Sequence, residues 1–226
     1  MIYTFTFILA FCSIAYELLL GQSLSAFLGN TVLRYSITIG LYMLSMGIGS
    51  LLAEGRFVRH PVTTLLKIEL LLTVTGGFSV IALLVLNSAG MPPLLFSALA
   101  HFLIIIIGIF TGFEIPLLIE LKNIETGRSE NSVLGIDYLG AFFGTVIFAF
   151  VFYPIVGLIP TAFFVASLNA AVGIGLLTQA SKVESQEQGQ YRALIILQSV
   201  LLVILVTCLS SAANINELFL RHYLGS

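Results

Sequence analysis

The sequence predicts an all-α fold, a polytopic membrane helix bundle with seven transmembrane helices. Of its 226 residues, 58% are hydrophobic and only 9% are charged, and the mean hydropathy is +1.09. A soluble domain carries about 25% charged residues, so this chain has too few charges to cover a water-facing surface. Seven apolar stretches also approach or exceed the length of about 20 residues that a helix needs to cross a bilayer.

The apolar stretches are separated by residues that end helices. The expected spans lie near 3–28, 36–53, 62–86, 94–119, 133–153, 158–180 and 193–212. Gly29-Asn30 ends the first and Glu54-Gly55-Arg56 the second. Residues 87–93 contain two prolines, which remove backbone donors and clash with the preceding helical turn. The remaining breaks are the charged segment 120–132, a short apolar turn at 153–160 and the hydrophilic segment 182–192.

These boundaries predict one seven-helix transmembrane domain over residues 1–212 and a short C-terminal tail over 213–226. The tail mixes apolar and polar residues in a pattern compatible with an interfacial helix. The N-terminus lacks the basic segment of a signal peptide, so the first span is expected to be retained.

Three of the apolar spans each carry an acid that points to function: Glu17, Glu114 and Asp137. Placing a carboxylate at the centre of a bilayer costs about 2.5–3.5 kcal/mol on insertion scales. Such residues therefore usually face the bundle interior, a partner or a polar path.

Each acid has a structural and a functional interpretation. Glu17 shares one helix face with Ser13 and Gly21, so it either fixes helix packing through a hydrogen bond or forms a cation or proton site. Glu114 lies two residues before Pro116, which cannot donate a hydrogen bond to the backbone carbonyl of Gly112. The free carbonyl and the Glu114 carboxylate could form a cation-binding pocket, or Glu114 could lie at a helix end near the headgroups. Asp137 lies in the first turns of its helix, where the helix dipole alone favours an anion.

Glycine pairs spaced four apart predict that the fourth and fifth spans pack together. Gly108 and Gly112 lie in the fourth span, and Gly140 and Gly144 lie in the fifth. Small residues at this spacing allow two helices to approach closely. This packing would bring Glu114 and Asp137 close to each other.

Other polar residues within the spans are candidate lining groups of the same site: Tyr16, Tyr138, Asn169 and His101. His101 is expected at the interface formed by the glycines of the fourth span, as a hydrogen-bonded residue or as a ligand. The chain has no metal-ligand spacing and no nucleotide-binding loop, so neither a metal nor a cofactor is expected. Its net charge of −2 and lack of a basic cluster argue against nucleic acid as a partner.

Five short motifs occur in order along the chain: Tyr16-Glu17-Leu18-Leu19, Phe27-Leu28-Gly29-Asn30 with Ser36-Ile37-Thr38-Ile39-Gly40-Leu41, Met46-Gly47-Ile48-Gly49-Ser50, Gly112-Phe113-Glu114-Ile115-Pro116-Leu117-Leu118 and Asp137-Tyr138-Leu139-Gly140-Ala141. Together they resemble the membrane domain of the membrane-bound spermidine synthase-like (polyamine aminopropyltransferase-like) family. The resemblance covers roughly residues 12–175, and Asn169 also fits it.

The resemblance implies chemistry that involves polyamines. Members of the family commonly join this membrane domain to a Rossmann-like domain that binds decarboxylated S-adenosylmethionine and a diamine. Since the sequence ends at Ser226 before such a domain, the chain on its own is not expected to be a transferase. It would act as a polyamine aminopropyltransferase only with a separate or missing catalytic domain.

Two functional hypotheses follow. In the first, the chain binds or transports a polyamine or a similar cation through Glu17, Glu114 and Asp137, with hydrogen bonds from Tyr16, Tyr138 and Asn169. In the second, the bundle is a membrane anchor or scaffold for a partner protein, or the membrane half of a split or truncated aminopropyltransferase. Both hypotheses place the chain in the lipid bilayer of the inner (plasma) membrane.

Basic residues predict the orientation in that membrane. Seven of the nine Lys and Arg residues fall on one side: Arg56, Arg59, Lys67, Lys122, Arg128, Lys182 and Arg192. Only Arg34 and Arg221 fall on the other side. Because basic residues stay on the cytoplasmic side, the N-terminus is expected in the cytoplasm and the C-terminus outside.

A reporter fusion tests this orientation. A reporter that is active only outside the cytoplasm should be active when it is fused after Ser226. The same reporter fused within the 182–192 segment should be silent. The orientation is wrong if a cytoplasmic reporter works after Ser226 and the external reporter does not.

Overall fold

The computed structural model describes residues 1–127 and 130–211, and this part of the chain contains helices and no strand. The predicted all-α fold is therefore confirmed. The α-helices are α1 (Ile2–Leu28), α2 (Thr31–Leu52), α3 (Arg56–Arg59), α4 (Pro61–Gly77), α5 (Ser79–Ser88), α6 (Pro93–Thr126), α7 (Glu130–Ile147), α8 (Leu158–Gly175) and α9 (Gln188–Ser210). The tail predicted over 213–226 lies outside the described residues.

Within the described residues, seven helical segments are long and apolar enough to cross a membrane, as the hydropathy pattern predicts. The segment expected over 62–86 consists of two helices, because α4 ends at Gly77 and α5 begins at Ser79. The two glycines before Phe78 have low helix propensity, which accounts for a break that hydropathy alone does not reveal.

The turn predicted over 153–160 is present but is confined to Gly157, and the residues on either side of it are helical. The helix α7 continues as a π-helix over Phe148–Val156, which contains Pro154. Gly157, with φ of 88°, separates this segment from α8. Proline lacks a backbone donor, and the wider π-helical turn accommodates it without ending the helix.

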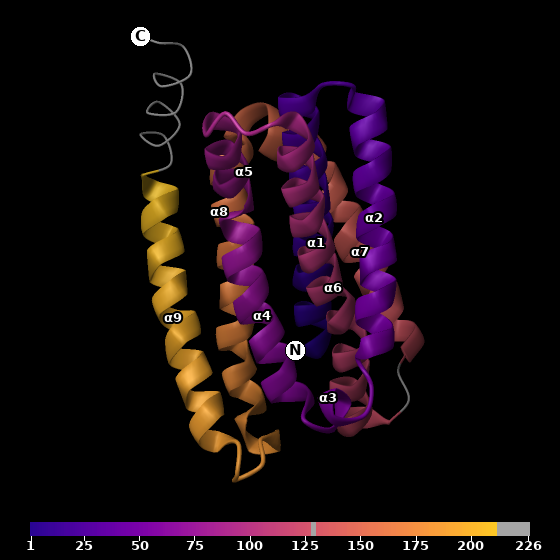
Figure 1. Ribbon diagram of the computed structural model, residues 1–226. Coiled ribbons are helices and arrows are strands. Elements are labelled where there is room, and N and C mark those ends of the chain that lie inside the picture. The colour runs from indigo at the N-terminus through magenta and orange to yellow at the C-terminus, as the bar shows by residue number, and fades with distance from the viewer. Residues whose placement is uncertain (128–129, 212–226) are drawn as a thin grey trace.

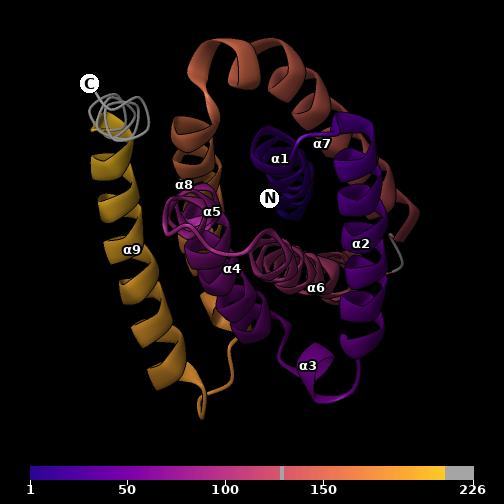
Figure 2. The ribbon, with the colours of Figure 1, turned by 45° about the horizontal axis from the view of Figure 1, so that its top comes forward.

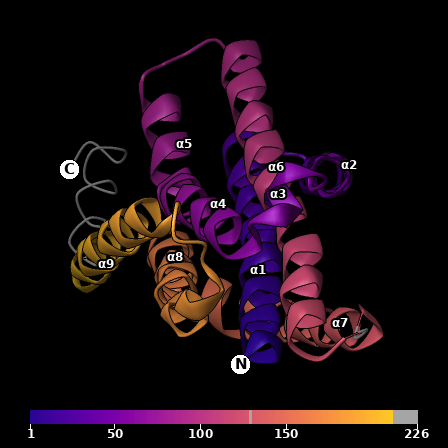
Figure 3. The same ribbon diagram turned by 90° about the horizontal axis from the view of Figure 1, so that it is seen from below.

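The helix α1 occupies the centre of the bundle, with α2, α6, α7 and α8 packed around it. Figure 2 shows it surrounded by the other helices, and Figure 3 shows α9 at the edge of the bundle, against α8 and α4. Its buried residues include polar as well as apolar side chains, among them Tyr16 and Glu17. The central helix therefore has to satisfy polar groups within the protein rather than in solvent.

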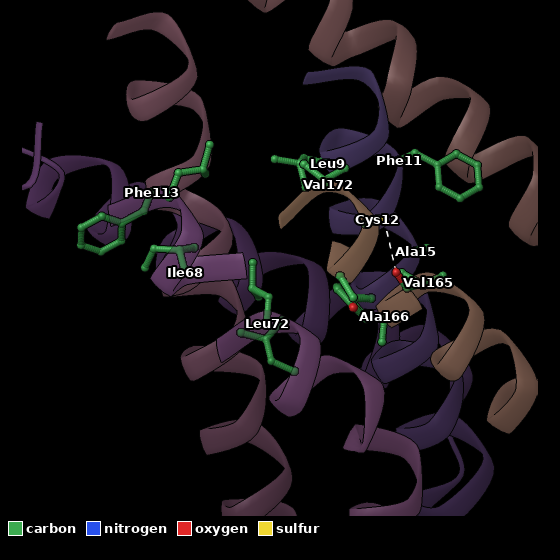
Figure 4. Close-up of a cluster of buried hydrophobic side chains, with 14 of the residues drawn as sticks. Leu9, Phe11, Cys12, Ala15, Ile68, Leu72, Phe113, Val165, Ala166 and Val172 are labelled. Atoms are coloured by element: carbon green, nitrogen blue, oxygen red, sulfur yellow. Dashed lines mark hydrogen bonds between the residues drawn. The ribbon is translucent and has the colours of Figure 1, made fainter. Parts of the chain in front are cut away.

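Apolar side chains from α1, α4, α6 and α8 fill the core between these helices (Figure 4). Leu9, Ala15, Leu72 and Ala166 have no exposed surface. The thiol of Cys12 donates to the carbonyl of Val165 across 3.6 Å, which links α1 to α8.

Ion pairs of the described residues gather at one end of the bundle. Lys182 Nζ lies 3.1 Å from a carboxylate oxygen of Glu125, which joins the end of α6 to the segment after α8. The His60 ring lies 3.6 Å from the Glu187 carboxylate, which also accepts a hydrogen bond of 2.7 Å from Thr63. This is the end where the chain passes from α2 to α4 and from α8 to α9 (Figure 1).

Close glycine contacts determine which helices meet face to face. A Cβ atom on Gly49 of α2 would collide with the backbone carbonyl of Ile109 on α6. A Cβ atom on Gly140 of α7 would collide with the carbonyl of Phe7 on α1. Only glycine permits backbones to approach this closely, so these positions fix the α2–α6 and α1–α7 pairs.

Paired alanine substitutions on α2 test this packing. Gly49→Ala should lower the free energy of unfolding by about 1–3 kcal/mol, because an added methyl group overpacks the α2–α6 contact. Gly47→Ala is the matched control, since a Cβ atom there has nothing within 4 Å. Thermal unfolding of both purified variants measures the difference, and equal midpoints would contradict the assigned contact.

Candidate functional site

A cavity of about 310 Å³ lies between α1, α2, α6 and α7 and is lined by three carboxylates. Glu17 comes from α1, Glu114 from α6 and Asp137 from α7. The other lining residues are Ala10, Ser13, Ile14, Met43, Met46, Thr111, Ile115, Tyr138 and Ala141. The cavity thus combines carboxylates and hydroxyl groups with apolar walls, and we call it the carboxylate cavity.

Helical spacing places these side chains. Ser13 and Glu17 are four residues apart on α1, so both face the cavity from the same side of that helix. Thr111 and Glu114 are three residues apart on α6 and share a face in the same way. Glu17 and Glu114 are buried within the protein. Their carboxylates are therefore removed from bulk solvent yet open to the cavity.

Tyr42 of α2 supports the cavity wall, although sequence reasoning does not single it out. Its hydroxyl donates to the backbone carbonyl of Ser13 across 3.0 Å and lies 3.3 Å from the Ser13 hydroxyl. The side chain has no exposed surface. Tyr42 therefore fixes α2 against the part of α1 that carries Ser13 and Glu17.

Among the described residues, no basic side chain lies beside the three carboxylates in the cavity. No Lys or Arg of the described chain lines the cavity. Within residues 1–127 and 130–211, the carboxylates of Glu17, Glu114 and Asp137 make no hydrogen bond or ion pair with another side chain or with the backbone. Buried anions without partners are costly, so this arrangement favours a proton, a cation or water in the cavity.

The glycine pairs do not join the helices that the sequence suggests. Gly108 and Gly112 of α6 contact Ser45 and Met46 of α2 rather than α7. Gly140 and Gly144 of α7 contact α1. The predicted packing of the fourth and fifth spans through their glycines is therefore wrong, because a small-residue face indicates close approach without specifying the partner.

Glu114 and Asp137 nevertheless line the same cavity, because α6 and α7 both pack beside α1. Tyr138, the residue after Asp137, also lines it, with 72% of its surface exposed. Tyr138 therefore stands at the outer part of the cavity.

Three of the predicted site residues lie elsewhere. Tyr16 and Asn169 have no exposed surface and do not line the carboxylate cavity. The Tyr16 hydroxyl and both polar side-chain atoms of Asn169 have no hydrogen-bond partner among the described residues. His101 bonds through Nδ1 to the backbone carbonyl of Ser97 on its own helix, which matches the packed interpretation rather than the ligand interpretation.

Glu69 is a further buried acid that the sequence pattern does not single out. It lies in α4 with no exposed surface, and neither carboxylate oxygen has a hydrogen-bond partner in the part of the chain described. The signal for it is the one that singles out the other acids, a lone carboxylate within an apolar stretch. Lys67, two residues earlier, conceals this signal because it suggests the end of a span.

Comparison with known proteins identifies relatives of this chain. It is 35% identical over 175 residues to a polyamine aminopropyltransferase of Leptospira interrogans, which covers 76% of the chain and 34% of that protein. It is 35% identical over 180 residues to a polyamine aminopropyltransferase of Oceanobacillus iheyensis, covering 78% of the chain and 35% of the relative. Over about three quarters of its length, the chain is therefore similar to a part of polyamine aminopropyltransferases.

A further relative is polyamine aminopropyltransferase 2 of Ralstonia nicotianae, 34% identical over 174 residues, which cover 76% of the chain and 34% of the relative. The chain spans about a third of the length of the polyamine aminopropyltransferases it matches. These relatives support the resemblance carried by the five motifs. No protein-family model and no solved structure matches the chain.

Proposed function

We propose that the chain is a seven-helix inner-membrane domain that binds or transports a polyamine or a similar cation at the carboxylate cavity. Membrane insertion is supported by the seven helices of sufficient length and hydropathy. It is also supported by large apolar side chains on the outside of the bundle, such as Leu51, Phe142, Phe150 and Val203. In water these exposed side chains would form large apolar patches, whereas lipid solvates them.

The observation that carries the proposal is the convergence of Glu17, Glu114 and Asp137 on one cavity without a basic residue among its lining. Three carboxylates in one apolar site repel one another, so a positively charged occupant would stabilise all of them. The relatives named for polyamine chemistry make an amine the natural cation.

The lining suits an alkyl ammonium compound better than a bare metal ion. The carboxylates would accept charge-assisted hydrogen bonds from ammonium groups. Met43, Met46 and Ile115 would contact the methylene groups between them. The volume of about 310 Å³ is at the lower end of the range known for small-molecule pockets. In addition, no three of the described His, Cys, Asp and Glu side chains lie close enough together to hold one metal ion.

The uncapped carboxylates favour binding over a purely structural role. If these acids only locked helices together, neighbouring donors would be expected to cap them. Ser13 and Thr111 both line the cavity, but neither hydroxyl bonds to a carboxylate. The Ser13 hydroxyl lies 3.3 Å from the Tyr42 hydroxyl. The Thr111 hydroxyl donates to backbone carbonyls of α6.

A second candidate function is the membrane part of a longer or two-chain aminopropyltransferase. It is favoured by the lengths of the relatives, because the matching region is only about a third of each. In that arrangement the bundle would anchor a catalytic domain or partner protein, and the carboxylate cavity would serve the same polyamine. The cation-binding proposal therefore applies to both candidates.

Isothermal calorimetry with spermidine tests the binding proposal. The purified full chain should bind spermidine, and the Glu17→Gln/Asp137→Asn double variant should bind it about tenfold or more weakly. Each charge-assisted hydrogen bond contributes about 1.5–3 kcal/mol, and about 1.4 kcal/mol corresponds to a factor of ten.

Glu54→Gln is the matched control, because Glu54 is an exposed acid after α2 that does not line the cavity. It should leave the affinity unchanged. Equal heats from the full chain and the double variant, or no heat from either, would rule out the carboxylate cavity as a polyamine site and leave the anchoring role.

A further inference from the structure

The carboxylate cavity lies near the middle of the bundle along the helix axes. Glu17 stands near the middle of α1, Met43 near the middle of α2 and Thr111 near the middle of α6. Asp137 lies about two helical turns after the start of α7. In a bundle that spans a bilayer as proposed, these positions fall in the hydrocarbon region and not at the headgroups.

Two of the four helices around the cavity do not close against each other. Helix α2 packs on α6, and α7 packs on α1. Within the described residues, α2 and α7 form the outer walls of the cavity without packing closely together. Figures 1 and 3 show both helices on the same side of the bundle, opposite α9.

One side chain on each of these helices belongs both to the cavity and to the outside of the bundle. Met43 of α2 and Tyr138 of α7 line the cavity, yet 64% and 72% of their surfaces are exposed. Together with the loose boundary between α2 and α7, this exposure places the two side chains at the rim of an opening. We call it the lateral opening.

The surface beside the lateral opening is apolar. Leu44 follows Met43 on α2, Leu139 follows Tyr138 on α7, and both leucines are exposed. Phe142, one helical turn after Tyr138, is exposed as well. In a bilayer, lipid acyl chains and not water solvate such a surface. A compound that passes the lateral opening therefore comes from the lipid phase.

We propose that the carboxylate cavity takes an amine that carries a hydrocarbon chain and enters from the bilayer through the lateral opening. The inference rests on the proposed cation binding and names the class of cation. The ammonium group pairs with Glu17, Glu114 and Asp137 through charge-assisted hydrogen bonds. The hydrocarbon chain passes between Met43 and Tyr138 to the apolar surface outside.

A single-headed amine matches this arrangement because the charged groups of the cavity lie inside and the apolar ones lie at the opening. A polyamine carries ammonium groups along its whole length. Any of them that lay in the lateral opening would stand among apolar side chains and lipid without a carboxylate, which is costly.

Quenching of a single tryptophan by brominated lipid tests the opening. The chain contains no tryptophan, so Tyr138→Trp places one fluorophore at the rim. In liposomes that hold the full chain, lipid brominated in the middle of its acyl chains should remove most of this fluorescence, whereas iodide in the water should not. Met43→Trp is a second reporter on the facing helix, in case the first variant folds poorly.

Relief of that quenching tests the ligand. Dodecylamine should restore the fluorescence of Tyr138→Trp, because its chain displaces brominated lipid from the opening. Dodecanol, which has the same chain without the charge, should not. Adding Glu17→Gln and Asp137→Asn should raise the midpoint concentration of dodecylamine about tenfold or more, since each lost charge-assisted hydrogen bond corresponds to at least that factor.

Tyr153→Trp is the matched control. Tyr153 is an exposed tyrosine on the helical continuation of α7 and does not line the cavity. Brominated lipid should quench a tryptophan there, and dodecylamine should not relieve the quenching.

The lipid route and the proposed cation binding can fail separately. Quenching of both rim reporters by iodide and not by brominated lipid would overturn the lateral opening. Equal relief by dodecylamine and dodecanol would show that the carboxylates do not select the amine and would also overturn the inference. Spermidine binding in calorimetry without any response to dodecylamine would overturn the lipid route alone. The reverse result, relief by dodecylamine without spermidine binding, would support the inference and reject the free polyamine.

Discussion

Within the described residues, the acids of the helix bundle lie without a basic side chain beside them, and the rest of the structure depends on this constraint. Glu17, Glu69, Glu114 and Asp137 all project into a helix bundle whose described ion pairs gather at one end. A carboxylate that is removed from water needs a proton, a cation or hydrogen-bond donors. The cavity leaves space for such a partner beside three of the acids, whereas Glu69 has no exposed surface.

Much of the fold can be predicted from hydropathy and helix-ending residues. The seven apolar segments and the breaks at Gly29-Asn30 and before Pro93 follow directly from the sequence. Two places differ from the prediction for local reasons that the hydropathy of the sequence does not indicate. Phe78 interrupts an apolar stretch without any change in polarity, and Pro154 is accommodated within a π-helical turn. Backbone geometry, rather than residue polarity, decides these two places.

The candidate site is predicted in part. Glu17, Glu114 and Asp137 are conspicuous because each is a lone acid in an apolar span, and the structure brings them to one cavity. Sequence spacing gives the face of a helix but not the helix that it meets, so the glycine pairs were assigned to the wrong neighbours. For the same reason Tyr16 and Asn169 cannot be separated from the cavity by sequence alone. Their positions depend on how α1 and α8 pack against α4.

The central position of α1 has a consequence for biogenesis. This helix is made before the helices that enclose it, because α7 and α8, which pack against it, begin more than a hundred residues after it ends. During synthesis, Glu17 and the surface of α1 that later contacts Gly140 and Gly144 of α7 therefore lack their final neighbours. For a chain inserted as it is made, the first helix has to be held by lipid or by the insertion machinery until the later helices arrive. The packing around α1 can therefore be completed only after α8 has been made.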